Sequence, residues 1–387
     1  MIPPVAPAGQ LFTRAFIALS LAELAYFTAT GLAIPVLPLF AAGPLGADEA
    51  GVGLVVGAFG LTALVLRPFA GRQADLRGRR PLLVGGALLC SVAIAAHAFT
   101  SDLAVVVGLR LLLGVAEAFF FVAGFAAVAD LAPPDRAGEA LSFNSLSLYL
   151  GIAIGPVIGE LLLEVGGFRL AWLGGAALAL GAAFLALRIP ETARPARSVV
   201  GPAQLLHPRA VGPSLALFSG IAGMAGFFAF LALHARDLGL DGAGPVLFMF
   251  GVIVIGCRIV FAKLPDRLPP FRLGALALAL IAVGLVLAAA AGSALGLFVG
   301  AAVLAVGVAF ATPAFFAAIF SRVRPSERGS ASGTASLFLD LAFGGGPAVL
   351  GFVAGASGIP AAFAAAAAVA GVGAFGTALA AIAARRR

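Results

Sequence analysis

The chain has 387 residues, of which 62% are hydrophobic and 11% charged, with a mean hydropathy of +1.12. So few charged side chains cannot cover the surface of a soluble globular protein, and the composition excludes that class. The net charge of +7 could indicate nucleic-acid binding. The positive residues are spread over short segments between apolar runs, however, so we expect no nucleic-acid partner.

Apolar segments long enough to cross about 30 Å of hydrocarbon recur along the chain. They predict twelve transmembrane helices, at 12–40, 50–70, 81–99, 103–130, 140–163, 168–188, 211–235, 243–262, 272–291, 295–320, 331–355 and 359–383. The expected fold class is an all-α membrane protein.

The basic residues predict the orientation of these helices. With a cytoplasmic N-terminus, every Lys and Arg except Arg110, Arg169 and Arg236 falls on the cytoplasmic side. Because cytoplasmic loops carry the excess of Lys and Arg, we expect both termini in the cytoplasm. Arginine and alanine are abundant and lysine is nearly absent, which favours a GC-rich bacterium and thus a bacterial inner-membrane protein.

The two halves of the chain are related by a constant shift of 191 positions. The shift pairs Arg67 with Arg258, Asp75 with Asp266, Pro134 with Pro325, Gly155-Pro156 with Gly346-Pro347, Gly167 with Gly358, and Trp172 with Phe363. Parallel repeats of this kind are typical of transporters. We expect two pseudo-symmetric six-helix bundles, 1–188 and 211–387, joined by a cytoplasmic linker, 189–210, that is rich in Pro and Arg.

Five ionisable residues are expected to be embedded in the membrane. They are Glu23, Arg110, Glu117, Glu160 and Asp340. A charge in hydrocarbon is costly unless it is paired or hydrated, so such residues favour proton coupling or substrate binding. Arg110 and Glu117 are seven residues apart and share one helix face. The alternatives are hydrogen bonds between helices for the acids, and for Glu160 a place at the outer interface.

A strongly basic segment follows the second span, Gly71-Arg72-Gln73-Ala74-Asp75-Leu76-Arg77-Gly78-Arg79-Arg80. We expect a short loop outside the hydrocarbon, in which Gly71 and Gly78 permit a tight backbone. It either controls a conformational switch or only sets topology. The shift of 191 positions pairs Asp75 with Asp266, but the glycines and the arginine cluster have no counterparts.

Glycines recur every four residues in the fifth span, at Gly151, Gly155 and Gly159, with Pro156 among them. Such a face lets helices approach closely, and the proline can kink the span. A role in the switch and plain close packing both remain open.

In this context the motifs resemble those of the major facilitator superfamily, over nearly the whole chain. Segment 71–80 is similar to that family's G-x-x-x-D-x-x-G-R-R/K signature, and Arg110-x-x-x-Gly114 to its fourth-span motif. The glycines of the fifth span resemble a signature of the twelve-span drug:proton antiporters. Glu160 stands where that signature often has a small residue.

The resemblance implies a secondary carrier that works by alternating access, and export more than uptake. The first, fourth, seventh and tenth helices would line its cavity, which suggests Tyr26, Phe120, Phe227 and Phe316 as lining residues. Asn144, at the start of the fifth span, would either line the cavity or make interhelical hydrogen bonds.

We therefore expect proton-coupled export of small lipophilic or cationic compounds by a monomer whose partners are substrate, protons and membrane lipid. No nucleotide-binding, metal-ligand or hydrolase motif is present, so we expect no enzyme activity, cofactor or metal. The alternatives are import or export of an endogenous metabolite, sugar or amino acid, and a non-transporting receptor on the same fold.

Overall fold

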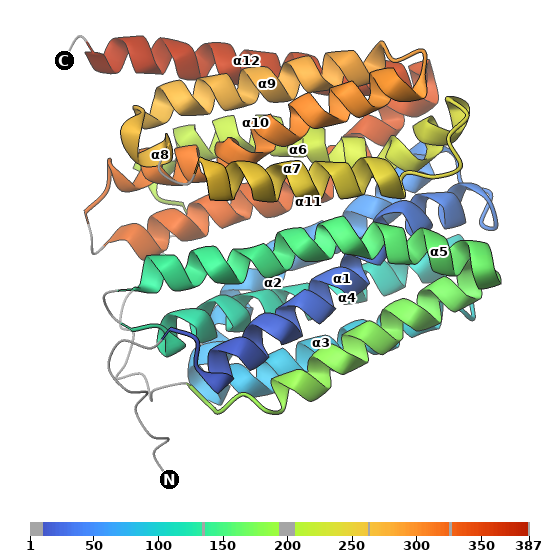
Figure 1. Ribbon diagram of the computed structural model, residues 1–387, viewed down its shortest axis with the longest axis horizontal. Helices are drawn as coiled ribbons and strands as arrows, with labels where there is room; N and C mark the ends of the chain where they lie inside the picture. Colours follow the sequence, from blue (N-terminus) through green and yellow to red (C-terminus); the bar gives the residue numbers. More distant parts are fainter. Residues whose placement is uncertain (1–10, 134–135, 193–205, 262–263, 325–326, 386–387) are drawn as a thin grey trace. The chain divides into compact units, whose positions relative to one another are not determined.

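The structure is a computed structural model that describes residues 11–133, 136–192, 206–261, 264–324 and 327–385. All regular secondary structure in these residues is helical, as expected for a chain whose backbone must satisfy its own hydrogen bonds in lipid. Figure 1 shows the helices: α1 (Arg14–Ala42), α2 (Glu49–Arg77), α3 (Arg79–His97), α4 (Leu103–Leu131), α5 (Ala137–Ala186), α6 (Pro208–Asp237), α7 (Gly244–Val260), α8 (Leu264–Arg267), α9 (Pro270–Ala289), α10 (Ala294–Phe320), α11 (Arg328–Ser357) and α12 (Ile359–Arg385).

Ten of these helices are long and apolar enough to cross a membrane. The all-helical membrane class predicted from composition is thereby confirmed. The predicted spans 140–163 and 168–188 both lie in α5, and the predicted span 243–262 corresponds to α7, which has only 17 residues. The exact number of twelve crossings therefore remains a prediction.

Helix α5 is 50 residues long but is not one straight rod. Gly166 (φ −146°, ψ 18°) and Gly167 (φ 68°, ψ −171°) leave the helical conformation, and the chain turns back at this point (Figure 1). A positive φ is disfavoured for every residue except glycine, so Gly167 permits the reversal. The two arms of α5 correspond to the two predicted spans.

The chain divides into two compact units. The first unit comprises 1–36 and 62–200, and the second comprises 37–61 and 201–387. In the first unit, α3 packs against α4 and α5; in the second, α9 packs against α10 and α12, and α11 against α6. The boundaries 1–188, 189–210 and 211–387 remain a prediction, and most of the linker lies outside the described residues.

The shift of 191 positions also relates close contacts inside the two units. In the first unit, a Cβ atom added to Gly155 would lie 2.8 Å from the carbonyl carbon of Gly31. In the second unit, a Cβ atom on Gly346 would lie 2.7 Å from the carbonyl oxygen of Ala222. Both pairs, 155/346 and 31/222, are 191 residues apart, so each unit contains the same backbone-to-backbone contact. Gly167 and Gly358 likewise both have positive φ.

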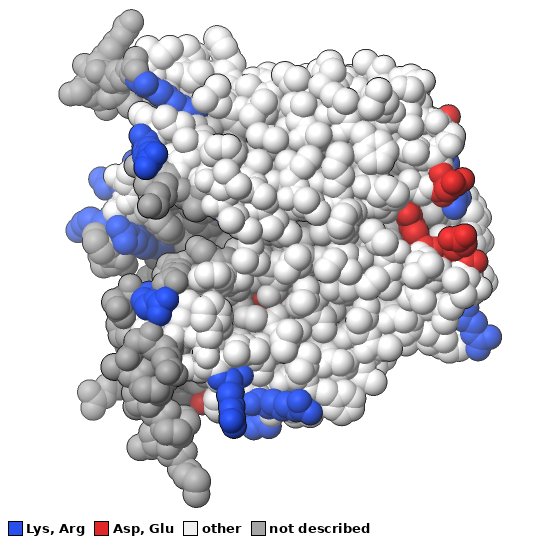
Figure 2. Space-filling model, viewed as in Figure 1, with Lys and Arg blue, Asp and Glu red and all other residues white. Residues whose placement is uncertain are grey.

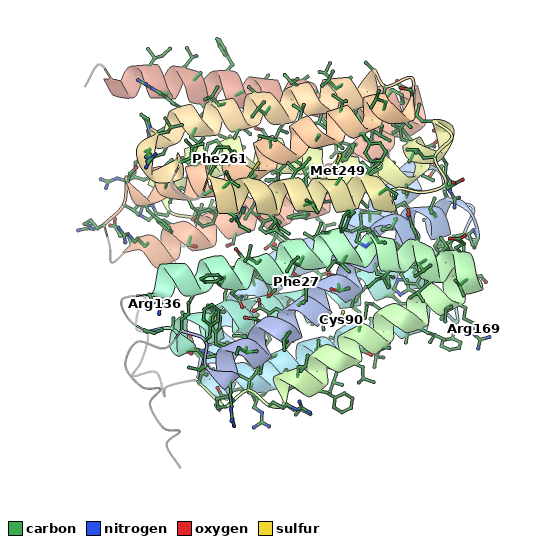
Figure 3. All side chains as sticks on the ribbon, in the orientation of Figure 1. Phe27, Cys90, Arg136, Arg169, Met249 and Phe261 are labelled. Carbon is green, nitrogen blue, oxygen red and sulfur yellow. The ribbon has the colours of Figure 1, made fainter. Side chains whose placement is uncertain are left out.

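Basic residues gather at one end of the helices in each unit taken by itself. In the second unit they include Arg272 in the first turn of α9, Arg322 directly after α10, and Arg328 at the start of α11. Figure 2 shows most of the visible Lys and Arg at this end, on the left of the view. In the first unit, Arg136 and Arg169 lie at opposite ends of the helices (Figure 3), where the sequence places them on opposite sides of the membrane.

Candidate functional site

The interior of the first unit contains a cluster of polar side chains from α1, α3, α4 and α5. Its framework is the contact between α1 and α5. Cβ atoms on Gly151, Gly155 and Gly159 would lie 2.6 Å from Phe27 Cβ, 2.6 Å from the Thr28 carbonyl oxygen and 2.7 Å from the Leu32 carbonyl oxygen, respectively. The glycine face predicted from the sequence therefore lets α5 approach the backbone of α1, and Pro156 is buried beside it.

Glu23 lies at the base of this contact and is only 4% exposed. The side-chain nitrogen of Asn144, itself 3% exposed, donates a hydrogen bond of 2.5 Å to Glu23 Oε2. Ser20 Oγ donates to Asn144 Oδ1 over 3.4 Å, which orients the amide. Because an amide donor can bond the charged or the protonated acid, this arrangement tolerates both states of Glu23.

Gly124 of α4 forms another wall around Glu23. A Cβ atom at this position would lie 2.5 Å from Glu23 Oε1, so any larger residue would displace the carboxyl group. Sequence reasoning missed Gly124. The available signal is its spacing, because Gly124 follows Glu117 by seven residues and so shares its helix face.

Glu117 and Arg110 of α4 complete the cluster. Tyr26 is hydrogen-bonded to Glu117 and to Cys90, and Glu117 interacts electrostatically with Glu23. Arg110, 9% exposed, interacts electrostatically with Cys90, Glu117 and Tyr26. The structure therefore brings together three of the predicted ionisable residues, Glu23, Glu117 and Arg110. It also places the buried Cys90 of α3 beside Tyr26 and Arg110 in the interior (Figure 3).

Aromatic packing holds Tyr26 in place. Its ring stacks on Phe120 with centroids 3.9 Å apart and an interplanar angle of 6°, and both side chains are buried. Next to this stack, Phe27 meets Phe121 edge to face, and the Arg67 guanidinium lies 4.5 Å from the Phe121 centroid. Tyr26 and Phe120 thus form a packed wall behind the carboxyl groups. Whether they line a substrate cavity remains a prediction.

The remaining predicted residues lie elsewhere. Glu160 is half-buried on α5, directly after Gly159. Asp340, 4% exposed on α11, belongs to the second unit, as do Phe227, which packs on Phe363, and Phe316, which packs on Phe320.

The prediction of a loop over 71–80 is wrong. Helix α2 continues to Arg77 and α3 begins at Arg79, so Asp75 lies in the last turn of α2 and Gly71 lies inside this helix. The only break is Gly78, with φ 101° and ψ 165°. Residues 72–77 are mostly good helix formers, and their charge marks the exit from the membrane without ending the helix.

Arg79 connects the end of α2 to the end of α4. Its guanidinium forms ion pairs with Asp75 (2.8 Å) and Asp130 (3.2 Å) and donates to the Ala74 carbonyl oxygen. Glu191 accepts the backbone N–H groups of Arg79 (2.8 Å) and Arg80 (3.2 Å), which caps α3.

Arg79 and Arg80 both have partners in the protein. Arg80 also donates to the Leu187 carbonyl oxygen. Sequence reasoning missed both Asp130 and Glu191 as partners. The Asp266 side chain, which was paired with Asp75 by the repeat, lies outside the described part of the structure.

The ten apolar helices, the repeated contacts and the buried ionisable cluster define a polytopic α-helical membrane protein with a polar interior. The model of the Major Facilitator Superfamily matches residues 19–347. The chain belongs to this superfamily of membrane transporters.

The matches to relatives cover most of this chain and most of each relative. The chain is 30% identical over 338 residues to an MFS-type transporter of Salmonella typhimurium (strain LT2), covering 84% of this chain and 86% of the relative. It is 32% identical over 375 residues to an MFS-type transporter of Pseudomonas aeruginosa (strain PAO1), covering 92% of each.

Solved structures share the fold. A bacterial homologue of the human lysosomal transporter Spinster, inward-facing and unoccupied, has a TM-score of 0.80 at 15% identity, covering 97% of this chain and 98% of that one. The human organic anion transporter MFSD10 has a TM-score of 0.72 at 19% identity, covering 94% and 98%. At these identities the likeness shows the fold alone.

Proposed function

We propose that this transporter exports small lipophilic or cationic compounds in exchange for protons. The observation that carries the proposal is the buried Glu23, held by Asn144 beside Glu117 and Arg110. A carboxyl group that is enclosed by protein and bonded by a neutral donor can bind either a proton or a substrate cation, but not both at once. Competition for one carboxylate would couple the two movements in opposite directions.

Arg110 and Tyr26 support this role for the carboxyl groups. Arg110 provides a fixed positive charge near Glu117, and the stacked ring of Tyr26 orients a hydroxyl group toward the same carboxyl. A proton moving between Glu23 and Glu117 would remain in a dry, preorganised environment, where electrostatic interactions are strong. Asp340 and Glu160 would contribute only if they face the same solute path in another conformation.

The switching machinery is proposed from the other two contact sets. The Gly151, Gly155 and Gly159 face would guide the movement of α5 along α1, with Pro156 as a point of bending. Gly71, Asp75, Gly78, Arg79 and Arg80, with Asp266 in the second half, would stabilise one of the alternating states. Both termini would be cytoplasmic, in agreement with the basic ends of the helices, and the membrane would be the bacterial inner membrane.

A second candidate rests on Arg110. A buried guanidinium beside the cluster suits a small organic anion, which would make the substrate an endogenous metabolite and not a lipophilic cation. The residues of the cluster are the same, so the two candidates differ in the charge of the solute.

Reconstitution of the full-length protein into proteoliposomes tests both candidates. An imposed pH gradient should drive uptake or release of some members of a panel of cationic, neutral and anionic solutes. Glu23→Gln should abolish the gradient-driven flux. Exchange of solute in the absence of a pH gradient should remain intact in this variant. Glu164→Gln, at an exposed position of α5, is the matched control. Gradient-driven flux of anions only would favour the second candidate. If the gradient drives the flux of no solute in the panel, the receptor alternative would be favoured.

A further inference from the structure

A pocket of about 290 Å³ lies in the second unit. It forms where α9 begins, α10 ends and α12 approaches its C-terminus. Its lining includes Pro269, Phe271, Arg272, Ser321, Arg322 and Ala381. In Figure 1 these three helix ends lie at the same end of the second unit.

Two arginines give this pocket its chemistry. The Arg322 guanidinium carbon lies 4.1 Å from the centroid of the Phe271 ring, and the Arg272 side chain is half-buried beside it. A guanidinium that stacks on an aromatic face keeps the N–H groups at its edge available. Ser321 Oγ already donates to the Ala318 carbonyl oxygen, so the guanidinium groups are the main side-chain donors. None of the residues lining the pocket is acidic.

The position of the pocket along the helices suits a lipid headgroup. Helices α9 and α10 are both candidate membrane spans, and the pocket is at their ends. Two arginines at such an end attract anionic headgroups, and the prolines with Phe271 offer an apolar wall to the glycerol and the first acyl carbons. We propose that this pocket binds the phosphate of an anionic phospholipid from the leaflet that contacts the basic ends of the helices.

The charge of the headgroup follows from the two guanidinium groups. A phosphodiester forms charge-assisted hydrogen bonds with both, in the planar geometry that arginine favours. In a zwitterionic headgroup, the attached ammonium group would come close to the same two arginines and be repelled. The pocket therefore distinguishes phosphatidylglycerol from phosphatidylcholine. This inference does not depend on the transported solute.

Native mass spectrometry of the full-length protein in detergent tests the inference. The first molecule of phosphatidylglycerol should bind more tightly than the first phosphatidylcholine. Arg272→Gln and Arg322→Gln should each weaken phosphatidylglycerol binding about fivefold, as expected for one arginine near a headgroup. Arg236→Gln, at an exposed position at the end of α6, should leave binding unchanged.

Two further measurements keep the outcome interpretable. Arg272→Lys and Arg322→Lys retain the charge and should keep most of the preference, which separates lost binding from lost folding. Glycerol phosphate and inorganic phosphate should not displace the lipid at millimolar concentration. Phosphatidylglycerol binding that is unchanged in the double Gln variant, or complete displacement by a soluble phosphate, would overturn the assignment to a lipid.

Discussion

The side-chain nitrogen of Asn144 donates a hydrogen bond of 2.5 Å to Glu23 Oε2, across 121 positions of the chain. Both side chains are almost fully buried, so bulk water cannot serve as an alternative hydrogen-bond partner for either group. The bond therefore joins α1 to α5 at the carboxyl group on which the proposed coupling depends.

Replacing Asn144 by Ala should destabilise the protein by about 1–3 kcal/mol, because the buried Glu23 carboxyl loses its amide donor. Thermal unfolding of the purified protein at pH 7 measures the loss. In the Glu23→Gln background, the same replacement should cost less, since the carboxyl acceptor of the bond is already absent. Ser147→Ala, which removes a hydrogen bond to the Ser20 carbonyl oxygen, is the control. Equal losses for Asn144→Ala in both backgrounds would contradict the pairing.

Gly155→Ala should lower stability by about 1–3 kcal/mol, since its methyl group would lie 2.6 Å from the Thr28 carbonyl oxygen. Gly181 lies on the same helix, and a Cβ atom there has no neighbour within 4 Å. Gly181→Ala should therefore be neutral or slightly stabilising. The midpoints of thermal unfolding of the two variants give the comparison, and a Gly155→Ala variant as stable as Gly181→Ala would argue against the close contact.

Arg79→Gln should impair transport more than Asp75→Asn does. In the ion pairs described here, Asp75 has one partner, Arg79. Arg79 has two, Asp75 and Asp130, and it also donates to the Ala74 carbonyl oxygen. We expect a loss of transport rate of about 2- to 30-fold, the range typical of residues that modulate coupling, with normal insertion. Flux per inserted molecule is the measurement, and Arg72→Gln, at an exposed site, is the control. A larger loss in Asp75→Asn would refute this order.

Glu191→Ala should loosen the first turn of α3, because the carboxylate accepts the N–H groups of Arg79 and Arg80. Loss of a helix cap costs about 0.5–2 kcal/mol. Hydrogen exchange at these amides should accelerate about 2- to 30-fold, which mass spectrometry of the peptides around residue 79 can follow. Exchange in α3 should not change in Glu164→Ala, and unchanged exchange in Glu191→Ala would show that another group caps the helix.

Glu327 predicts a specific dependence of stability on pH. Its hydrogen bonds with Arg324 hold the pKa of this carboxyl down to about 2, from an ordinary value of 4.5. A depressed pKa contributes stability that is present above pH 4.5 and is lost as the pH falls toward 2. The stability advantage of the wild type over Glu327→Gln should thus shrink as the pH falls from 4.5 toward 2, which thermal unfolding at a series of pH values measures. Because His207 Nε2 lies 3.7 Å from Glu327 Oε2, the same comparison in a His207→Gln background separates the contribution of the histidine. An advantage that stays constant below pH 4.5 would contradict the depressed pKa.

The class of fold could be predicted from the sequence because hydropathy and the distribution of arginines report directly on the membrane. The polar surroundings of the buried Glu23 were also predictable, since an acid in the middle of an apolar segment needs a special environment. The identity of its partner was not. Asn144 was recognised only as polar, because a pairing between residues 121 positions apart leaves no periodic pattern in the chain.

The ends of helices were the least predictable feature. The cluster of charges at 72–80 indicated a loop, yet α2 continues to Arg77, because charged residues outside the lipid remain good helix formers. Gly124 escaped notice for a different reason. A lone glycine in an apolar helix carries no signal of its own, and its role depends on the Glu23 carboxyl that lies against it.

The glycine contact between α1 and α5 also sets the axial register of Glu23 and Asn144. Both helices run in the same direction at this contact, since Glu23 meets Asn144 and Phe27 meets Gly151 further along. One helical turn of sliding corresponds to 5.4 Å, far more than a hydrogen bond can tolerate. A displacement of α5 along α1 by one turn would therefore break the bond to the carboxyl group, so that such a movement would change the polar surroundings of Glu23.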